Sequence, residues 1–176
     1  MENQSHTLIN LSNLFRNDAS KFNSAEIQLK NSLQEWIGIA DSPKLKDVLQ
    51  KYLVLIQKHL DNLEAFFTDE EMTDINTKNR VMEACIIECD DKIESCLDKE
   101  VRDAGLLACV QLINHVKIST YGTAAAFAKV MQMDKYASIF YEAEINEKQI
   151  DNRLSQLAEF EINIRAKSIL LSDSNH

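Results

Sequence analysis

Glycine and proline are almost absent from this chain: three glycines and one proline occur among 176 residues. They make up about 2% of the sequence, where average usage is roughly 12%. A many-stranded sheet needs many tight turns, and tight turns depend on these two residues for their backbone angles. The chain has too few of them for a sheet protein, so the first prediction is an all-helical fold.

Apolar residues recur at intervals of three and four along most of the chain, which is typical of helices with one buried face. Leu11, Phe15 and Leu29 belong to the first of these stripes. Pro43 suits the first turn of a second helix, and Asp134 is expected to cap the last one. The pattern predicts long helices at about residues 8–40, 43–67, 100–132 and 134–168, with a shorter helix at about 81–97.

Four long helices can surround one shared core as a bundle. The passage from about 68 to 99 is long enough to bring the second and third long helices parallel to each other, as in ferritin-like topology. We therefore predict an all-α, ferritin-like four-helix bundle with a shorter helix in the crossover between helices 2 and 3. A single domain is expected over residues 1–171, followed by a frayed tail at 172–176.

The chain is acidic, with 28 acidic and 19 basic side chains and a formal net charge of −9. Duplex-binding proteins gain most of their affinity from lysine and arginine on phosphates, so nucleic acid is not an expected partner. The most hydrophobic segment contains Gln111, Asn114 and Lys117, which are costly at mid-depth in lipid, so no membrane span is expected. The polar first ten residues lack the features of a secretory signal, which favours the cytoplasm.

The four cysteines, Cys85, Cys89, Cys96 and Cys109, lie in segments with a helical pattern. Their spacing does not match a zinc knuckle, and a reducing compartment keeps them as thiols. The favoured interpretation is that they are small core side chains. The alternative is thiol-based redox sensing by Cys85, Cys89 and Cys96.

Two glutamates interrupt apolar stripes that the bundle must bury: Glu26 in the first stripe and Glu147 in the last. Inward carboxylates from different helices indicate either a carboxylate-bridged metal pair or a partner side chain. Lys117 can be that partner, because an ammonium that faces a buried carboxylate can stay charged and offset its desolvation. We expect a buried charge pair of Lys117 with Glu26 or Glu147; the alternative is that Lys117 reaches the edge of the bundle.

Other polar residues on the last two long helices have simpler interpretations. Asn114 and Tyr121 are expected to place polar groups in the core. His115 lies on a different face from Lys117, so a packing role is favoured over metal ligation. Asp151 follows Glu147 by one turn, and a surface ion-pair network explains it equally well. The chain has no phosphate-binding glycine loop and no nucleophile with its base, which argues against a hydrolase or a nucleotide enzyme.

A set of short motifs extends from the first predicted helix to the last. They are Ser24-Ala25-Glu26 with Gln28-Leu29, Met82-Glu83-Ala84 with Glu88, Glu100-Val101-Arg102-Asp103-Ala104, Tyr121-Gly122-Thr123, and Asp151 with Leu154 and Leu157-Ala158. Together they resemble the YciE/YciF family of bacterial ferritin-like proteins over about residues 20 to 160. The resemblance implies a ferritin-like bundle, often dimeric, that is associated with stress responses and with a proposed metal centre.

The chain departs from that family where a metal centre needs ligands. Where the family's second helix tends to read His-Leu-Glu-Glu, this chain has Tyr52-Leu53-Val54-Leu55; where the third reads Glu-His-Tyr-Glu, it has Asn114-His115-Val116-Lys117. Where the family's fourth helix carries a row of three glutamates, this chain keeps only the last, Glu147, after Ile145 and Asn146. Two hard cations need several anionic oxygens. A di-iron or di-manganese centre is therefore not expected, and Lys117 is expected to supply the positive charge that metal supplies elsewhere.

The leading hypothesis is a metal-free bundle with a structural or partner-binding role, linked to the stress response by the resemblance, with no cofactor and no enzymatic activity. A homodimer is expected, because the stretch from Tyr52 to Ile56 is apolar on all sides and indicates an interface or a position under the crossover. The alternative hypothesis is ferroxidase-like or iron-storage activity. Iron or manganese would then occupy a weaker site formed by Glu26, Glu83, Glu147, Asp151 and His115.

Overall fold

The computed structural model describes residues 8–73, 75 and 77–172, and these form helices and connections without a strand. The helices are α1 (Leu11–Ile39), α2 (Pro43–Asp69), α3 (Arg80–Glu94), α4 (Lys99–Val130), α5 (Asp134–Leu157), the π-helical segment η1 (Ala158–Ile162) and α6 (Asn163–Ser172). None of the helices in these described ranges is both long and apolar enough to cross a membrane.

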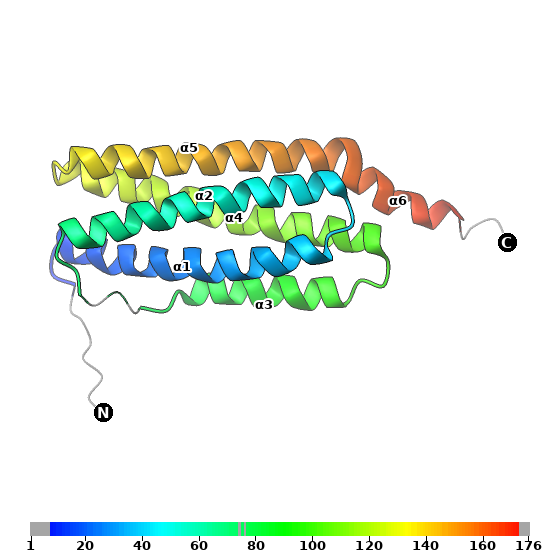
Figure 1. The fold of residues 1–176 in the computed structure, drawn as a ribbon, viewed down its shortest axis with the longest axis horizontal. Helices are drawn as coiled ribbons and strands as arrows, with labels where there is room; N and C mark the ends of the chain where they lie inside the picture. Colours follow the sequence, from blue (N-terminus) through cyan, green and yellow to red (C-terminus); the bar gives the residue numbers. More distant parts are fainter. Residues whose placement is uncertain (1–7, 74, 76, 173–176) are drawn as a thin grey trace, which may run out of the picture.

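The four long helices, α1, α2, α4 and α5, lie side by side, and α3 covers α1 and α4 on the outside (Figure 1). The chain turns back between α1 and α2, and again between α4 and α5. Between α2 and α4 it crosses the length of the bundle through a loop and α3, so that α2 and α4 run parallel (Figure 1). The predicted all-α, ferritin-like bundle with a short helix in its crossover is confirmed.

Four of the helices begin directly after a residue whose side chain accepts a hydrogen bond from a free backbone N–H group. Asn10 accepts a hydrogen bond from the N–H of Asn13 at 2.8 Å, and Asn79 accepts one from Met82 at 2.9 Å. Ser42 and Asp98 cap α2 and α4 in the same way. Each cap satisfies donors that have no partner inside the helix, which explains where these helices begin.

The prediction for the last helix is wrong in two respects. The residue before the helix is Met133, and Asp134 is the first helical residue, where its carboxylate meets Lys129. The single helix expected at 134–168 is divided by η1, after which α6 continues to Ser172. Ser172 is therefore helical, and the rest of the predicted frayed tail, 173–176, lies outside the described residues.

Buried apolar side chains form two clusters, one toward each end of the bundle. The aliphatic cluster includes Leu29 and Leu33 on α1, Leu45 and Leu49 on α2, Leu106, Val110 and Ile113 on α4, and Ile150 and Leu154 on α5. The aromatic cluster includes Phe15 and Phe22 on α1, Leu63 and Phe66 on α2, Tyr121 on α4, and Tyr136 and Phe140 on α5. On each long helix, one buried charged or imidazole side chain lies in sequence between the two clusters: Glu26, His59, Lys117 and Glu147.

Candidate functional site

The four side chains between the two clusters meet in the middle of the bundle. Glu26 comes from α1, His59 from α2, Lys117 from α4 and Glu147 from α5, and none is more than 3% exposed. Each lies on the buried face of its helix, at a position where an apolar residue is expected. We call these four residues the central polar site.

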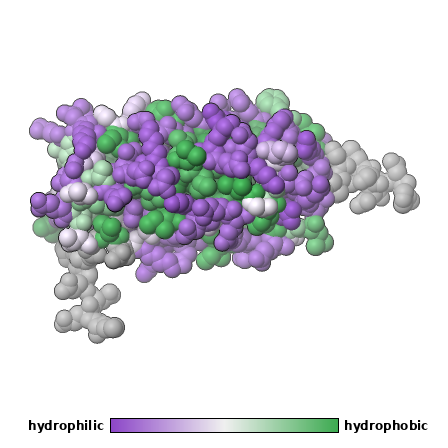
Figure 2. Space-filling model, viewed as in Figure 1, coloured by the Kyte–Doolittle hydropathy of each residue, from purple (hydrophilic) through white to green (hydrophobic). Residues whose placement is uncertain are grey.

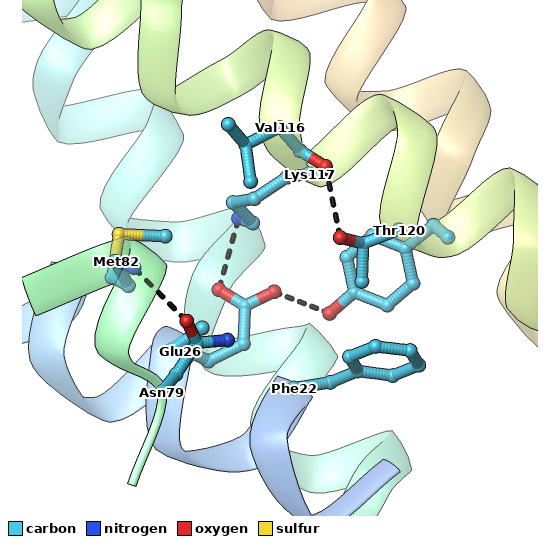
Figure 3. Close-up of a pocket in the computed structure, with 9 residues that line it drawn as sticks. Phe22, Glu26, Asn79, Met82, Val116, Lys117 and Thr120 are labelled. Atoms are coloured by element: carbon cyan, nitrogen blue, oxygen red, sulfur yellow. Dashed lines mark hydrogen bonds and ion pairs between the residues drawn. The ribbon is translucent and has the colours of Figure 1, made fainter. Parts of the chain in front are cut away.

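Lys117 lies between the two carboxylates. Its Nζ is 2.9 Å from Glu26 Oε2 and 2.6 Å from Glu147 Oε1, and it also lies 4.7 Å from the centre of the Tyr52 ring. Figure 3 shows the lysine side chain directed at Glu26 across the space between α1 and α4. The structure thus places the Lys117 ammonium against both of the glutamates considered as partners, and away from the bundle edge.

His59 joins the same pair of carboxylates from the opposite helix. Its Nδ1 lies 3.2 Å from Glu26 Oε1 and 3.4 Å from Glu147 Oε1. A carboxylate can only accept, so these contacts require the proton of the imidazole to be on Nδ1. His59 Nε2 is buried and has no hydrogen-bond partner among the described residues.

Two tyrosines and an asparagine satisfy the remaining carboxylate oxygens. The Tyr121 hydroxyl donates to Glu26 Oε1, and the Tyr52 hydroxyl donates to Glu147 Oε2 at 2.6 Å. Asn114 Nδ2 donates to the same Oε2 at 2.6 Å and to the backbone oxygen of Glu147 at 3.0 Å. Every oxygen of both buried carboxylates therefore faces a donor supplied by this chain.

The neighbouring charges shift the pKa values of Glu26 and Lys117. Burial alone raises the pKa of Glu26, but the Lys117 ammonium and the hydrogen bonds from His59 and Tyr121 outweigh it and lower the pKa to about 2. Burial alone lowers the pKa of Lys117, but the carboxylates of Glu147 and Glu26 outweigh it and raise the pKa. At neutral pH the glutamate is an anion and the lysine a cation.

Burial and the two glutamates also raise the pKa values of the tyrosine hydroxyls, Tyr52 and Tyr121, well above 10. Both hydroxyls therefore keep their protons at neutral pH and remain hydrogen-bond donors. This fixes their role in the site as donors to carboxylates and leaves no phenolate to bind a cation.

A small cavity of about 10 Å³ adjoins the site on the side of α3. Its walls come from α1, α3, α4 and the residue before α3, and Figure 3 shows Glu26 and Lys117, joined by their ion pair, among the residues that line it. A volume of about 10 Å³ is at the lower limit for one water molecule. This cavity is therefore too small for a substrate larger than a water molecule.

Comparison with known proteins agrees with this fold and with the motifs in the sequence. The family model described as a domain of unknown function, DUF892, matches residues 10–167. The chain belongs to the DUF892 family. It is 31% identical over 146 residues to protein YciF of Escherichia coli (strain K12), covering 82% of this chain and 88% of that protein.

Two solved structures of similar proteins have the same fold. The crystal structure of the E. coli stress protein YciF superposes with a TM-score of 0.83 at 29% identity, covering 89% of this chain and 99% of that one. YcfI of Rhodopseudomonas palustris, described as a proposed structural protein, superposes with a TM-score of 0.82 at 24% identity, covering 86% of this chain and 96% of that one. The second likeness, at lower identity, shows the fold alone.

The central polar site of this DUF892 protein does not fit a two-metal centre. Only Glu26, His59 and Glu147 bring potential ligand atoms together, within 4.8 Å of one another, among the residues that the structure describes. The Lys117 ammonium already contacts both carboxylates, and a cation beside it would be repelled. Two hard cations need more anionic oxygens than two glutamates supply.

The other residues considered as weak metal candidates lie elsewhere. Glu83 is partly exposed and pairs with Lys78 before α3. Asp151 pairs with His115 at 3.0 Å on the outer surface of α4 and α5. The packing role expected for His115 is wrong, because its side chain is 64% exposed and this pair is its contact. The structure does not bring Glu83, His115 or Asp151 into the central polar site.

One member of the site, His59, and one of its hydrogen-bond donors, Tyr52, were not predicted from the sequence. His59 lies in the apolar stripe of α2, three residues after Ile56 and four before Leu63, and the same reasoning that selected Glu26 could have selected it. Tyr52 was assigned to an interface or to a position under the crossover. It is instead fully buried and turned into the core.

Proposed function

We propose that this chain is a cytoplasmic, metal-free helical bundle that acts as a structural or partner-binding protein in a bacterial stress response. The supporting observation is the position of Lys117 Nζ, 2.9 Å from Glu26 and 2.6 Å from Glu147. An ammonium at this point gives both carboxylates a cationic partner without a metal ion. The site then holds four helices in register and performs no reaction.

The stress role rests on relatedness. The chain is 29% identical to YciF, which is described as a stress protein, over 89% of its length. The family model that matches this chain is described as a domain of unknown function. In this chain the two buried glutamates already have a cationic partner in Lys117, so we propose that folding needs no metal ion.

A ferrous oxidation assay tests the absence of metal chemistry. With ferrous iron and dissolved oxygen at pH 7, the chain is expected to leave the oxidation rate at that of buffer, because the carboxylates that would bind iron are already paired with Lys117. Absorbance of ferric iron reports the rate. Saturable, protein-dependent oxidation that is lost in Glu26→Gln would contradict the proposal.

A second candidate function is a mononuclear metal site with ferroxidase-like or iron-storage activity. It is favoured by the three potential ligand atoms of Glu26, His59 and Glu147, which lie within 4.8 Å of one another. An ion there would have to displace Lys117 from both carboxylates. The ferrous oxidation assay separates the two functions, because only this candidate predicts saturation with iron.

We also propose a homodimer formed through the middle of α2. Tyr52 and Ile56 are buried in the core, but between them Val54 is 71% exposed, and Leu53 and Leu55 are half-buried. Ile27 of α1 is also exposed, and it lines a groove of about 470 Å³ that begins at Gln57, three residues after Val54 on α2. Figure 2 shows hydrophobic side chains gathered along the middle of the face on which α1 and α2 lie.

Val54→Asp is expected to convert the dimer to a monomer, because a charge at the centre of an apolar interface is left unpaired. Light scattering at micromolar concentration measures the change, and circular dichroism checks that the helices persist. Val81→Asp, at another exposed valine in the first turn of α3, is the matched control and should leave the dimer intact. A monomeric wild-type protein would refute this interface.

A further inference from the structure

Two cysteines face each other where α3 packs on α4. Cys89 of α3 and Cys109 of α4 are both buried in the aliphatic cluster, and their side chains are neighbours. Neither cysteine forms a disulfide in this structure. The pair belongs to neither the central polar site nor the exposed face of α2.

The register of the two helices explains why these cysteines meet. α3 and α4 are antiparallel and joined by a short connection, and Gly105 of α4 lies against Lys92 and Cys96 of α3. Cys109 is one turn beyond Gly105, and Cys89 is one turn before Lys92. Both residues therefore lie on the faces of α3 and α4 that pack together, one helical turn away from the contact of Gly105 with Lys92.

The other two cysteines are placed differently. The thiol of Cys96 donates to the backbone oxygen of Lys92 in its own helix, at 3.2 Å. Cys85 is half-buried one turn before Cys89 and is not its hydrogen-bond partner. The thiol set considered from the sequence, Cys85, Cys89 and Cys96, thus omitted the residue that pairs with Cys89.

The local charges make the two thiols unequal. The hydrogen bond from Cys89 and the ammonium of Lys92 lower the pKa of Cys109 to about 7 against the effect of burial. The same hydrogen bond and burial raise the pKa of Cys89. At neutral pH, Cys109 has the greater thiolate character and is the better nucleophile, and Cys89 is the thiol held beside it.

From this juxtaposition we propose that Cys89 and Cys109 are a modification site: hydroperoxides oxidise the pair to a reversible disulfide that joins the crossover helix α3 to α4. The closed loop is short, and the two helices already pack in this register. Because Cys89 is fully buried and Cys109 almost so, the oxidant is a small one such as hydrogen peroxide.

The chemistry balances in two steps. The Cys109 thiolate attacks one peroxide oxygen, forming an S–O bond while the O–O bond breaks and hydroxide leaves; this yields a sulfenic acid. Cys89 then attacks the sulfenic sulfur, forming the S–S bond and breaking the S–O bond, and its proton leaves with the hydroxide as water. Overall, two thiols lose two electrons and two protons, and one hydrogen peroxide becomes two waters. A dithiol reductant reverses the change.

The test is thiol counting and mass spectrometry on the full chain after treatment with hydrogen peroxide at pH 7. We expect free thiols to fall from four to two per chain, a Cys89–Cys109 cross-linked peptide, and full recovery with dithiothreitol. Cys85→Ser and Cys96→Ser should form the same cross-link. In Cys89→Ser, a sulfenic acid trap such as dimedone should label Cys109.

Other outcomes would overturn the proposal. These are no thiol loss at peroxide concentrations that oxidise free cysteine, a cross-link that includes Cys85 or Cys96, or disulfides only between chains. Oxidation that appears only in urea would also overturn it, because the pair would then react only after unfolding. Circular dichroism of each serine variant establishes that it is folded, so a lost cross-link reports the missing thiol.

Discussion

Lys117→Glu is expected to lower the free energy of unfolding by roughly 3–5 kcal/mol, the usual cost of leaving a buried charge unpaired. In the native protein the Lys117 ammonium contacts Glu26 and Glu147, and all three side chains are buried. The substitution places a third carboxylate beside those two and removes their cation. Because whole-domain stability is about 5–15 kcal/mol, a loss of this size brings the bundle close to unfolding.

Urea unfolding followed by circular dichroism measures the loss. Lys58→Glu is the control, because Lys58 pairs with Glu142 on the surface, and we expect a change of less than about 1 kcal/mol there. Lys117→Met, which removes the cation without adding an anion, should be intermediate. If Lys117→Glu is instead as stable as the wild type and binds metal, Lys117 is dispensable, and the result favours the second candidate function, a mononuclear metal site.

Acid is expected to destabilise the protein through Glu26. The ordinary pKa of a glutamate is 4.5, and Lys117 together with its hydrogen-bonding neighbours lowers the pKa of Glu26 to about 2 in the folded state. A carboxylate with a lowered folded pKa contributes stability above its unfolded pKa and loses it as the pH falls. The difference corresponds to about 3 kcal/mol, lost between about pH 4.5 and pH 2.

Urea midpoints measured from pH 7 to pH 2 give this profile. Glu26→Gln should be less stable at pH 7 and should lack the steep part of the acid loss. Asp69→Asn, at an exposed carboxylate that pairs with Lys135, should keep that part of the profile. A wild-type stability that stays constant between pH 5 and pH 3 would contradict the charge pairing of Glu26.

The parts of the fold that could be predicted are those fixed by local sequence. The stripes of α1 and α2, the proline at the start of α2 and the lack of turn residues locate the helices directly. The break at η1 was not predicted, and its signal in the sequence is weak: the buried residues Leu157 and Ile162 are five positions apart, where an α-helical stripe has intervals of three and four. A π-helical segment changes hydrogen bonding without changing composition.

The central polar site could be predicted in part for the same reason. Glu26, Glu147 and Lys117 interrupt apolar patterns, so the sequence indicates that they need interior partners. That His59 and Tyr52 join them depends on how each helix is rotated about its axis, which periodicity alone does not determine. The rotation of α4 likewise places His115 at the surface beside Asp151, where a packing role was expected.

The metal content of the untagged protein after anaerobic reconstitution with ferrous iron and desalting tests the central claim most directly. Because the ammonium of Lys117 already contacts the buried carboxylates of both Glu26 and Glu147 and takes the position that a cation would need, we predict iron far below one equivalent per chain, with the fold and its stability unchanged by a chelator. About one or two irons bound per chain, with oxygen-dependent oxidation, would contradict the account.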